Sequence, residues 1–124
     1  MTLVVCVSRR EDDGRLTSVE LEPCDGGEPS LAGFENWRST VWGSAVSRRL
    51  GCKLLPLLAT QDLHAELDDI TLVMEDVARL REHIAEVAAA GSDPNSVLFR
   101  LDTLARAAAV AASIPDRRGH LTVW

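Results

Sequence analysis

The fold class follows first from residues 68–113, which read DDITLVMEDVARLREHIAEVAAAGSDPNSVLFRLDTLARAAAVAAS. Apolar residues recur at helical spacings of three and four in two runs, 70–87 and 97–111. Gly91 stops the first run. Asp93 and Pro94 start the second, as an N-cap and a first helical residue. We therefore predict two amphipathic helices that pack as an antiparallel hairpin.

The N-terminal part carries strand patterns instead. Residues 2–8, TLVVCVS, form a short β-branched apolar run, typical of a strand buried on both faces. A charged turn, RREDDG, separates it from residues 15–22, RLTSVELE, which alternate as a hairpin partner would. Residues 23–30 hold two prolines and two glycines and are predicted to be a loop.

A helix is predicted over residues 30–50, followed by Gly51 as a C-cap. Its apolar face is made by Phe34, Trp37, Val41 and Ala45. Trp37 lies on that face and is expected in the core. Trp42 lies about 100° further round the helix, at the border of the face, where a tryptophan either covers the protein's own core or contacts a partner.

Residues 52–59, CKLLPLLA, are predicted to be a strand that lies at an edge or carries a bulge, because Pro56 cannot donate to a ladder. Such an edge makes a homodimer possible. Residues 62–68 fit either a strand or a helical stripe; we favour a strand, with Asp68 or Asp69 capping the next helix. Residues 120–124, HLTVW, alternate as a closing strand.

The elements follow the order β-β-α-β-(β)-α-α-β. This order predicts a single α+β domain over residues 1–124, a two-layer sandwich in which three helices cover a small mixed sheet of four or five strands. Hydrophobic residues make up 46% of the 124 residues and charged residues 26%, as in ordinary globular proteins. The net charge of −6 argues against a nucleic-acid partner.

Sequence motifs for catalysis and cofactor binding are missing. The chain has no GxSxG, HExxH or glycine-rich phosphate loop, so no enzyme activity and no cofactor are predicted. Cys6, Cys24 and Cys52 form no CxxC pair and are interpreted as reduced thiols, without a metal. No stretch approaches the roughly 20 apolar residues of a membrane span, and the N-terminus does not resemble a signal peptide. A cytoplasmic location is expected.

Acidic side chains gather before the second predicted helix, at Asp62, Glu66, Asp68 and Asp69. Carboxylates favour a helix N-terminus, so a solvated helix start explains part of this cluster. A second interpretation is an acidic edge that binds a protein partner together with Trp42. A third is a small enzyme or ligand-binding domain that uses His64, Asp62 and Glu66.

The layout resembles the small immunity proteins of bacterial polymorphic toxin systems, nearest the immunity family numbered seventy. The similarity covers roughly residues 3–90. Phe34, Trp37 and Arg38 match a Phe-x-x-aromatic-Arg pattern, and Gly51 with Pro56 approximates a Gly-x-x-apolar-Pro strand. Residues 60–67, TQDLHAEL, depart from the family's pattern. The resemblance implies a protein that binds and neutralises a cognate toxin domain by occluding its active site, without a cofactor.

Overall fold

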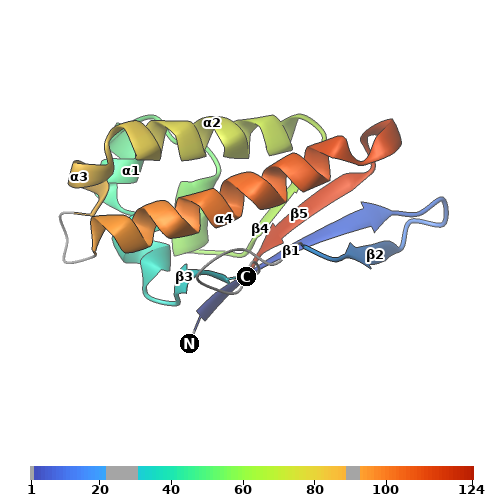
Figure 1. Cartoon of the computed structure of the whole chain (residues 1–124), viewed down its shortest axis with the longest axis horizontal. Helices are drawn as coiled ribbons and strands as arrows, with labels where there is room; N and C mark the ends of the chain where they lie inside the picture. Colours follow the sequence, from blue (N-terminus) through green and yellow to red (C-terminus); the bar gives the residue numbers. More distant parts are fainter. Residues whose placement is uncertain (1, 22–30, 89–92) are drawn as a thin grey trace.

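Two long helices lie across one face of a β-sheet (Figure 1). The computed structural model describes residues 2–21, 31–88 and 93–124. Helix α2 (Asp68–Glu82) and helix α4 (Pro94–Ser113) run in opposite directions and pack on each other. The predicted α+β sandwich and its helical hairpin are confirmed. Asp93 caps α4 as expected, because its side chain accepts a hydrogen bond from the N–H of Ser96 at 3.1 Å.

The sheet has five strands in the order β2-β1-β5-β4, with β3 paired to the start of β1. These are β1 (Thr2–Arg10), β2 (Leu16–Val19), β3 (Leu31–Phe34), β4 (Leu63–Glu66) and β5 (Gly119–Val123). All four pairings are antiparallel, so the prediction of a mixed sheet was wrong. Only one face of β1 is fully buried, through Leu3, Val5 and Val7, and the prediction of burial on both faces was wrong.

The core lies between this sheet and the helices. Alanines on α4 let the helix approach β5 closely: a Cβ atom added to Gly119 would lie 1.9 Å from the carbonyl oxygen of Ala111. Only glycine fits at that contact. Ala107, Ala108 and Ala111 are all buried on the same side of α4. The small side chains therefore set the spacing between the two layers.

Residues 31–50 do not form the predicted single helix. After β3 the chain makes a π-helical turn, η1 (Arg38–Trp42), and a short helix, α1 (Ala45–Arg49). Ser44 starts α1 anew by accepting a hydrogen bond from the N–H of Ser47. Phe34 is 62% exposed and does not join Trp37 in the core. Leu50 is the C-cap of α1, and Gly51 follows it with a φ of 93°, so the predicted glycine lies one residue beyond the cap.

Residues 52–59 are not a strand either. They contain a 3₁₀ helix, η2 (Leu55–Ala59), in which Pro56 is buried. The carboxylate of Asp76, itself fully buried, accepts hydrogen bonds from the N–H groups of Lys53 (2.9 Å), Leu54 (2.8 Å) and Leu55 (3.0 Å). Asp76 thus holds this segment rather than facing solvent. Without an edge strand at Pro56, the predicted route to a homodimer loses its basis.

The ambiguous segment before α2 is a strand, as favoured. The N-cap of α2 is Leu67, not Asp68 or Asp69, and it takes a φ of 55° without a side-chain cap. The helix is interrupted at His83 and continues as α3 (Ile84–Val87). A 3₁₀ turn, η3 (Pro115–Arg117), leads into β5. Residues 22–30 and Gly91, with the predicted loop and helix stop, lie outside the described residues.

Candidate functional site on the outer face of the sheet

The sheet face that points away from α2 and α4 carries a cluster of titratable side chains. The register places Glu66 of β4 opposite His120 of β5, and His64 opposite Thr122. Residues opposite each other share a face, and neighbours along a strand alternate between faces. The buried Ala65 and Leu121 belong to the inner face. The two histidines and Glu66 therefore share the outer face.

These three side chains form a chain of polar contacts. Nδ1 of His120 lies 2.6 Å from Oε1 of Glu66, and Nε2 of His120 lies 3.3 Å from Nδ1 of His64. The guanidinium of Arg10 also bonds Oε1 of Glu66, with Nε at 3.0 Å, and Arg10 is held in turn by the carbonyl of Gly14. We call Arg10, His64, Glu66 and His120 the outer-face cluster.

Hydrogen bonding and burial act on the protonation of Glu66 in the outer-face cluster. Hydrogen bonding from Arg10, assisted by His120, lowers the pKa of Glu66 although partial burial opposes it. Glu66 is therefore ionised at neutral pH and accepts the Nδ1 proton of His120. When both imidazoles are neutral, Nε2 of His120 accepts from Nδ1–H of His64, which leaves Nε2 of His64 as an acceptor. His120 is only 7% exposed in its side chain, whereas His64 is exposed.

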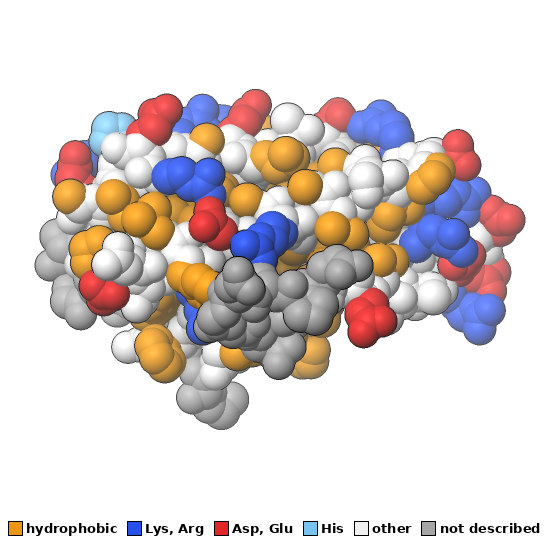
Figure 2. All heavy atoms as spheres, viewed as in Figure 1, with side chains coloured by type: hydrophobic (Ala, Val, Ile, Leu, Met, Phe, Trp, Pro, Cys, Tyr) orange, Lys and Arg blue, Asp and Glu red, His pale blue; other side chains and the backbone are white. Residues whose placement is uncertain are grey.

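A groove of about 400 Å³ adjoins the outer-face cluster at the end of the sheet, and Arg10 and Glu66 line it. Three non-glycine residues in the described ranges have positive φ, and all three line this groove: Leu67 (55°), Asp116 (61°) and Arg117 (56°). Backbone strain of this kind concentrates at functional sites. Figure 2 shows basic and acidic side chains gathered at the end of the molecule where the β1–β2 turn and η3 lie, on its right.

Most of the predicted acidic edge is neutralised by arginines. Asp62 pairs with Arg38 at 2.8 Å, and Asp68 pairs with Arg117 at 2.6 Å. Glu66 pairs with Arg10. Asp69 is exposed and has no ion pair with a described residue. The four carboxylates therefore do not form a continuous negatively charged surface, because three of them are paired with arginines.

Asp62 also stands apart from the outer-face cluster. Its partner Arg38 donates to the carbonyls of Leu58 (3.2 Å) and Gln61 (3.0 Å) and to Glu35. This arginine ties η1 to the segment between η2 and β4. The structure thus brings together His64 and Glu66, but not Asp62, among the three residues of the predicted enzyme or ligand site.

Trp42 does not lie at the border of a helix face. Its side chain is 0% exposed, its Nε1–H donates to the carbonyl of Ala32 at 3.0 Å, and its ring lies 5.7 Å from that of Trp37. The prediction that Trp42 contacts a partner is wrong for this structure, because no part of the ring is accessible. Trp124 is instead the exposed tryptophan, at 54%, and its backbone pairs with Val4.

The sequence prediction missed His120 and Arg10 as members of the site. One signal was available: His64 and Glu66 are two residues apart on a predicted strand, which puts both on one face. His120 opens another predicted strand, but joining it to the first two needs the order and register of the strands. Arg10 lay in a segment predicted to be a turn, whereas β1 extends through it.

Potential metal ligands and cysteine thiols are scattered over the described ranges. No three His, Cys, Asp or Glu side chains in residues 2–21, 31–88 and 93–124 are grouped to hold a metal ion. Cys6 and Cys52 are free thiols, and burial raises the pKa of Cys52. Cys24 lies outside these ranges. None of the described helices is both long enough and apolar enough to cross a membrane.

Comparison of the sequence with protein-family models and with curated proteins, and of the structure with solved structures, gave no significant match.

Proposed function

We propose that this chain is an immunity protein that binds a toxin domain through the outer face of its sheet and occludes the toxin's active site. The observation that carries the proposal is the outer-face cluster itself. Its polar groups are held in place before any partner arrives, since Arg10 and His120 fix Glu66 from two sides. Preorganised side chains lose little entropy on binding.

Exposed apolar side chains near the cluster support a protein partner. Trp124 extends the outer-face alternation of His120 and Thr122, and Leu67 follows Glu66 at the groove with 53% of its surface exposed. Binding energy in protein interfaces concentrates on such aromatic and apolar anchors, with polar groups around them. The two long helices, α2 and α4, both lie on the opposite face of the sheet (Figure 1).

The chemistry of the partner follows from charge. With a net charge of −6, the chain attracts a basic protein domain, and this attraction raises the association rate at low salt. Occlusion requires neither a catalytic residue nor a cofactor. The resemblance to polymorphic-toxin immunity proteins supports the same role and a cytoplasmic location, where such a toxin would act on the producing cell.

The test is co-expression with the C-terminal domain of the protein encoded immediately upstream of this chain's gene, scored by growth of the host and by co-purification. The wild-type chain is expected to restore growth, and the double substitution His64→Ala with Trp124→Ala to abolish the rescue. Met74→Ala removes an exposed side chain from α2, outside the binding face, and is the control variant that should still restore growth. Absence of a complex with the wild-type chain would disprove the toxin role. Rescue by the double variant would disprove the binding face.

A second candidate is a ligand-binding or hydrolytic domain, favoured by the Glu66–His120–His64 chain beside a groove. An imidazole whose Nε2 is a free acceptor can serve as a general base. An activated aryl ester offered to the purified chain is then cleaved faster than in buffer, and His64→Gln removes the acceleration. Equal rates for the wild type and His64→Gln would reject this candidate.

A further inference from the structure

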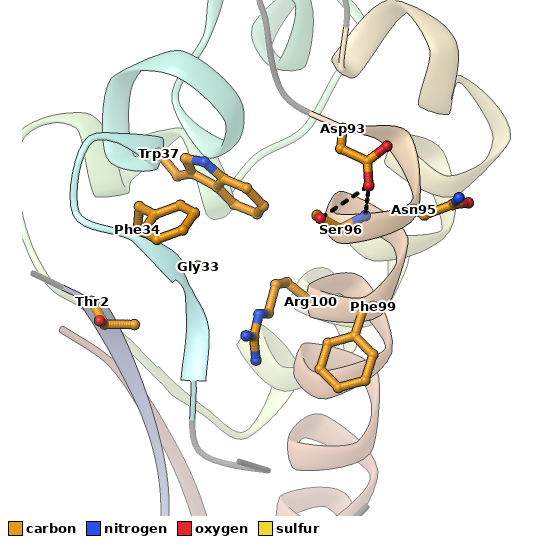
Figure 3. A pocket seen from close by; sticks show the side chains of 9 residues that line it. All are labelled: Thr2, Gly33, Phe34, Trp37, Asp93, Asn95, Ser96, Phe99 and Arg100. Atoms are coloured by element: carbon orange, nitrogen blue, oxygen red, sulfur yellow. Dashed lines mark hydrogen bonds between the residues drawn. The ribbon is translucent and has the colours of Figure 1, made fainter. Parts of the chain in front are cut away.

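A second pocket, of about 360 Å³, lies between β3 and the first turns of α4 (Figure 3). Thr2, Gly33, Phe34 and Trp37 form one wall, and residues of α4 with the cap Asp93 form the other. The whole chain has three tryptophans, two phenylalanines and no tyrosine. Both phenylalanines and one of the tryptophans line this pocket, which is three of the five aromatic side chains of the chain.

The aromatic wall is built by a tight backbone contact. Gly33 has a φ of 105°, and a Cβ atom there would lie 2.3 Å from Cε3 of Trp37, so only glycine lets the indole lie against β3. Phe34 stands edge-on to Trp37, with ring centroids 5.8 Å apart. Trp37 is buried while Phe34 is mostly exposed. The indole forms a fixed floor, and the phenyl ring forms the open side.

A cation reaches into this aromatic space. The Cζ atom of Arg100 lies 4.8 Å from the centroid of the Phe99 ring, and Nη1 donates to the carbonyl of Leu31 at 3.3 Å. In Figure 3 the guanidinium points from α4 into the space in front of β3. The described residues give Arg100 no carboxylate partner. Its remaining N–H groups are thus available, within the described ranges, to an anion in the pocket.

We propose that this pocket binds a small aromatic carboxylate, a single-ring molecule whose ring lies against Phe34 and Trp37 and whose carboxylate pairs with Arg100. A guanidinium matches a carboxylate with two parallel hydrogen bonds. The pocket volume is at the lower end of the range for small-molecule sites, which suits one ring. This inference concerns a different site from the proposed toxin-binding face and does not rest on it.

Asp93 restricts the ligand to one negative charge. Its carboxylate is already used as the N-cap of α4, accepting from the N–H and from the hydroxyl of Ser96, both at 3.1 Å. It lines the same pocket as Arg100. A second carboxylate placed near Asp93 would meet a like charge, so a dicarboxylate of the same ring size binds less well.

The test is titration of the ¹⁵N-labelled full chain with phenylacetate, with its neutral analogue phenylacetamide as the comparison. We expect saturable shifts of the Trp37 indole N–H signal and of amides in the first turns of α4. We also expect at least about tenfold tighter binding of the acid than of the amide, because charge-assisted hydrogen bonds are the stronger ones. No saturable shift at millimolar phenylacetate, or equal affinities for the two compounds, would overturn the proposal.

Variants then locate the site. Arg100→Gln is expected to remove the preference for the acid, and Arg100→Lys to keep part of it because the charge remains. Arg106→Gln changes an exposed arginine on the same helix and is the matched control. Thermal unfolding verifies that each variant is folded. An unchanged acid preference in folded Arg100→Gln would place the binding elsewhere and reject this pocket.

Discussion

Oδ2 of Asp76 accepts the backbone N–H of Leu54 at 2.8 Å. This hydrogen bond joins the middle of α2 to a segment that lies 22 residues earlier in the chain. The same carboxylate receives the neighbouring N–H groups of Lys53 and Leu55. These donors would otherwise be unpaired at the start of η2, where Leu55 is buried. The Asp76 side chain thus supplies the hydrogen-bond acceptors that a neighbouring strand would have supplied if this segment were part of the sheet.

Asp76→Asn should lower the free energy of unfolding by roughly 2–4 kcal/mol, since the charge is lost and an amide N–H₂ faces backbone donors. Urea denaturation measures the difference. Glu75→Gln, at an exposed position beside it, is the control and should change stability by less than about 0.5 kcal/mol. Similar losses for the two variants would contradict the role given to Asp76.

Trp42→Phe should cost roughly 1–3 kcal/mol, because it leaves a small cavity and removes the donor for the carbonyl of Ala32. Trp124→Phe is the matched substitution at an exposed tryptophan and should stay within about 0.5 kcal/mol. Chemical denaturation gives both values. Equal values would mean that Trp42 is not in the core.

Gly119→Ala should destabilise the fold by about 3 kcal/mol or more, because the new methyl group meets the backbone oxygen of Ala111 and neither backbone can yield cheaply. Thermal unfolding of the variant measures the loss. Thr122→Ala, on the outer face of the same strand, is the control and should be mild. A well-folded Gly119→Ala with wild-type stability would show that α4 and β5 are further apart.

The stability of the protein should fall in acid through Glu66. Its folded pKa lies below the ordinary value of 4.5, so the unfolded chain binds this proton more readily. The resulting stabilisation is present above the ordinary pKa and is lost as the pH falls through the lowered folded pKa. Between about pH 5 and pH 3, the wild type should lose more stability than Glu66→Gln. Parallel pH profiles in denaturation experiments would refute this linkage.

Local sequence signals were sufficient where the partner of each residue is close in sequence. The β1–β2 hairpin turns within a few residues, and Asp93 caps its own helix, so both were predicted correctly. The stripe on α2 was also read correctly as far as Leu80, since one face of a helix must meet the core whatever lies opposite. The break at His83 had no such local signal.

Distant contacts decided the segments that were predicted wrongly. Phe34, Trp37 and Val41 have helical spacing, but Leu31 pairs with Val4 of β1 and draws residues 31–34 into the sheet. The apolar run 52–59 has the pattern of a strand, but the Asp76 carboxylate accepts hydrogen bonds from its backbone and the run contains a 3₁₀ helix instead. The candidate site shows the same limit: His64 and Glu66 were visible as a pair, whereas His120 joins them only through the register of β4 with β5.

The position of β5 bears on how the chain folds during synthesis. β5 lies between β1 and β4 and follows both long helices in the sequence. The sheet therefore stays in two halves until residues 119–123 leave the ribosome, and β1 and β4 each present an open edge to other nascent chains before then. Long-range strand pairing of this kind is slow, so chaperones that cover the open edges of β1 and β4 should improve the folding yield. His120 arrives on that same strand, so the histidine pair forms when the two halves join.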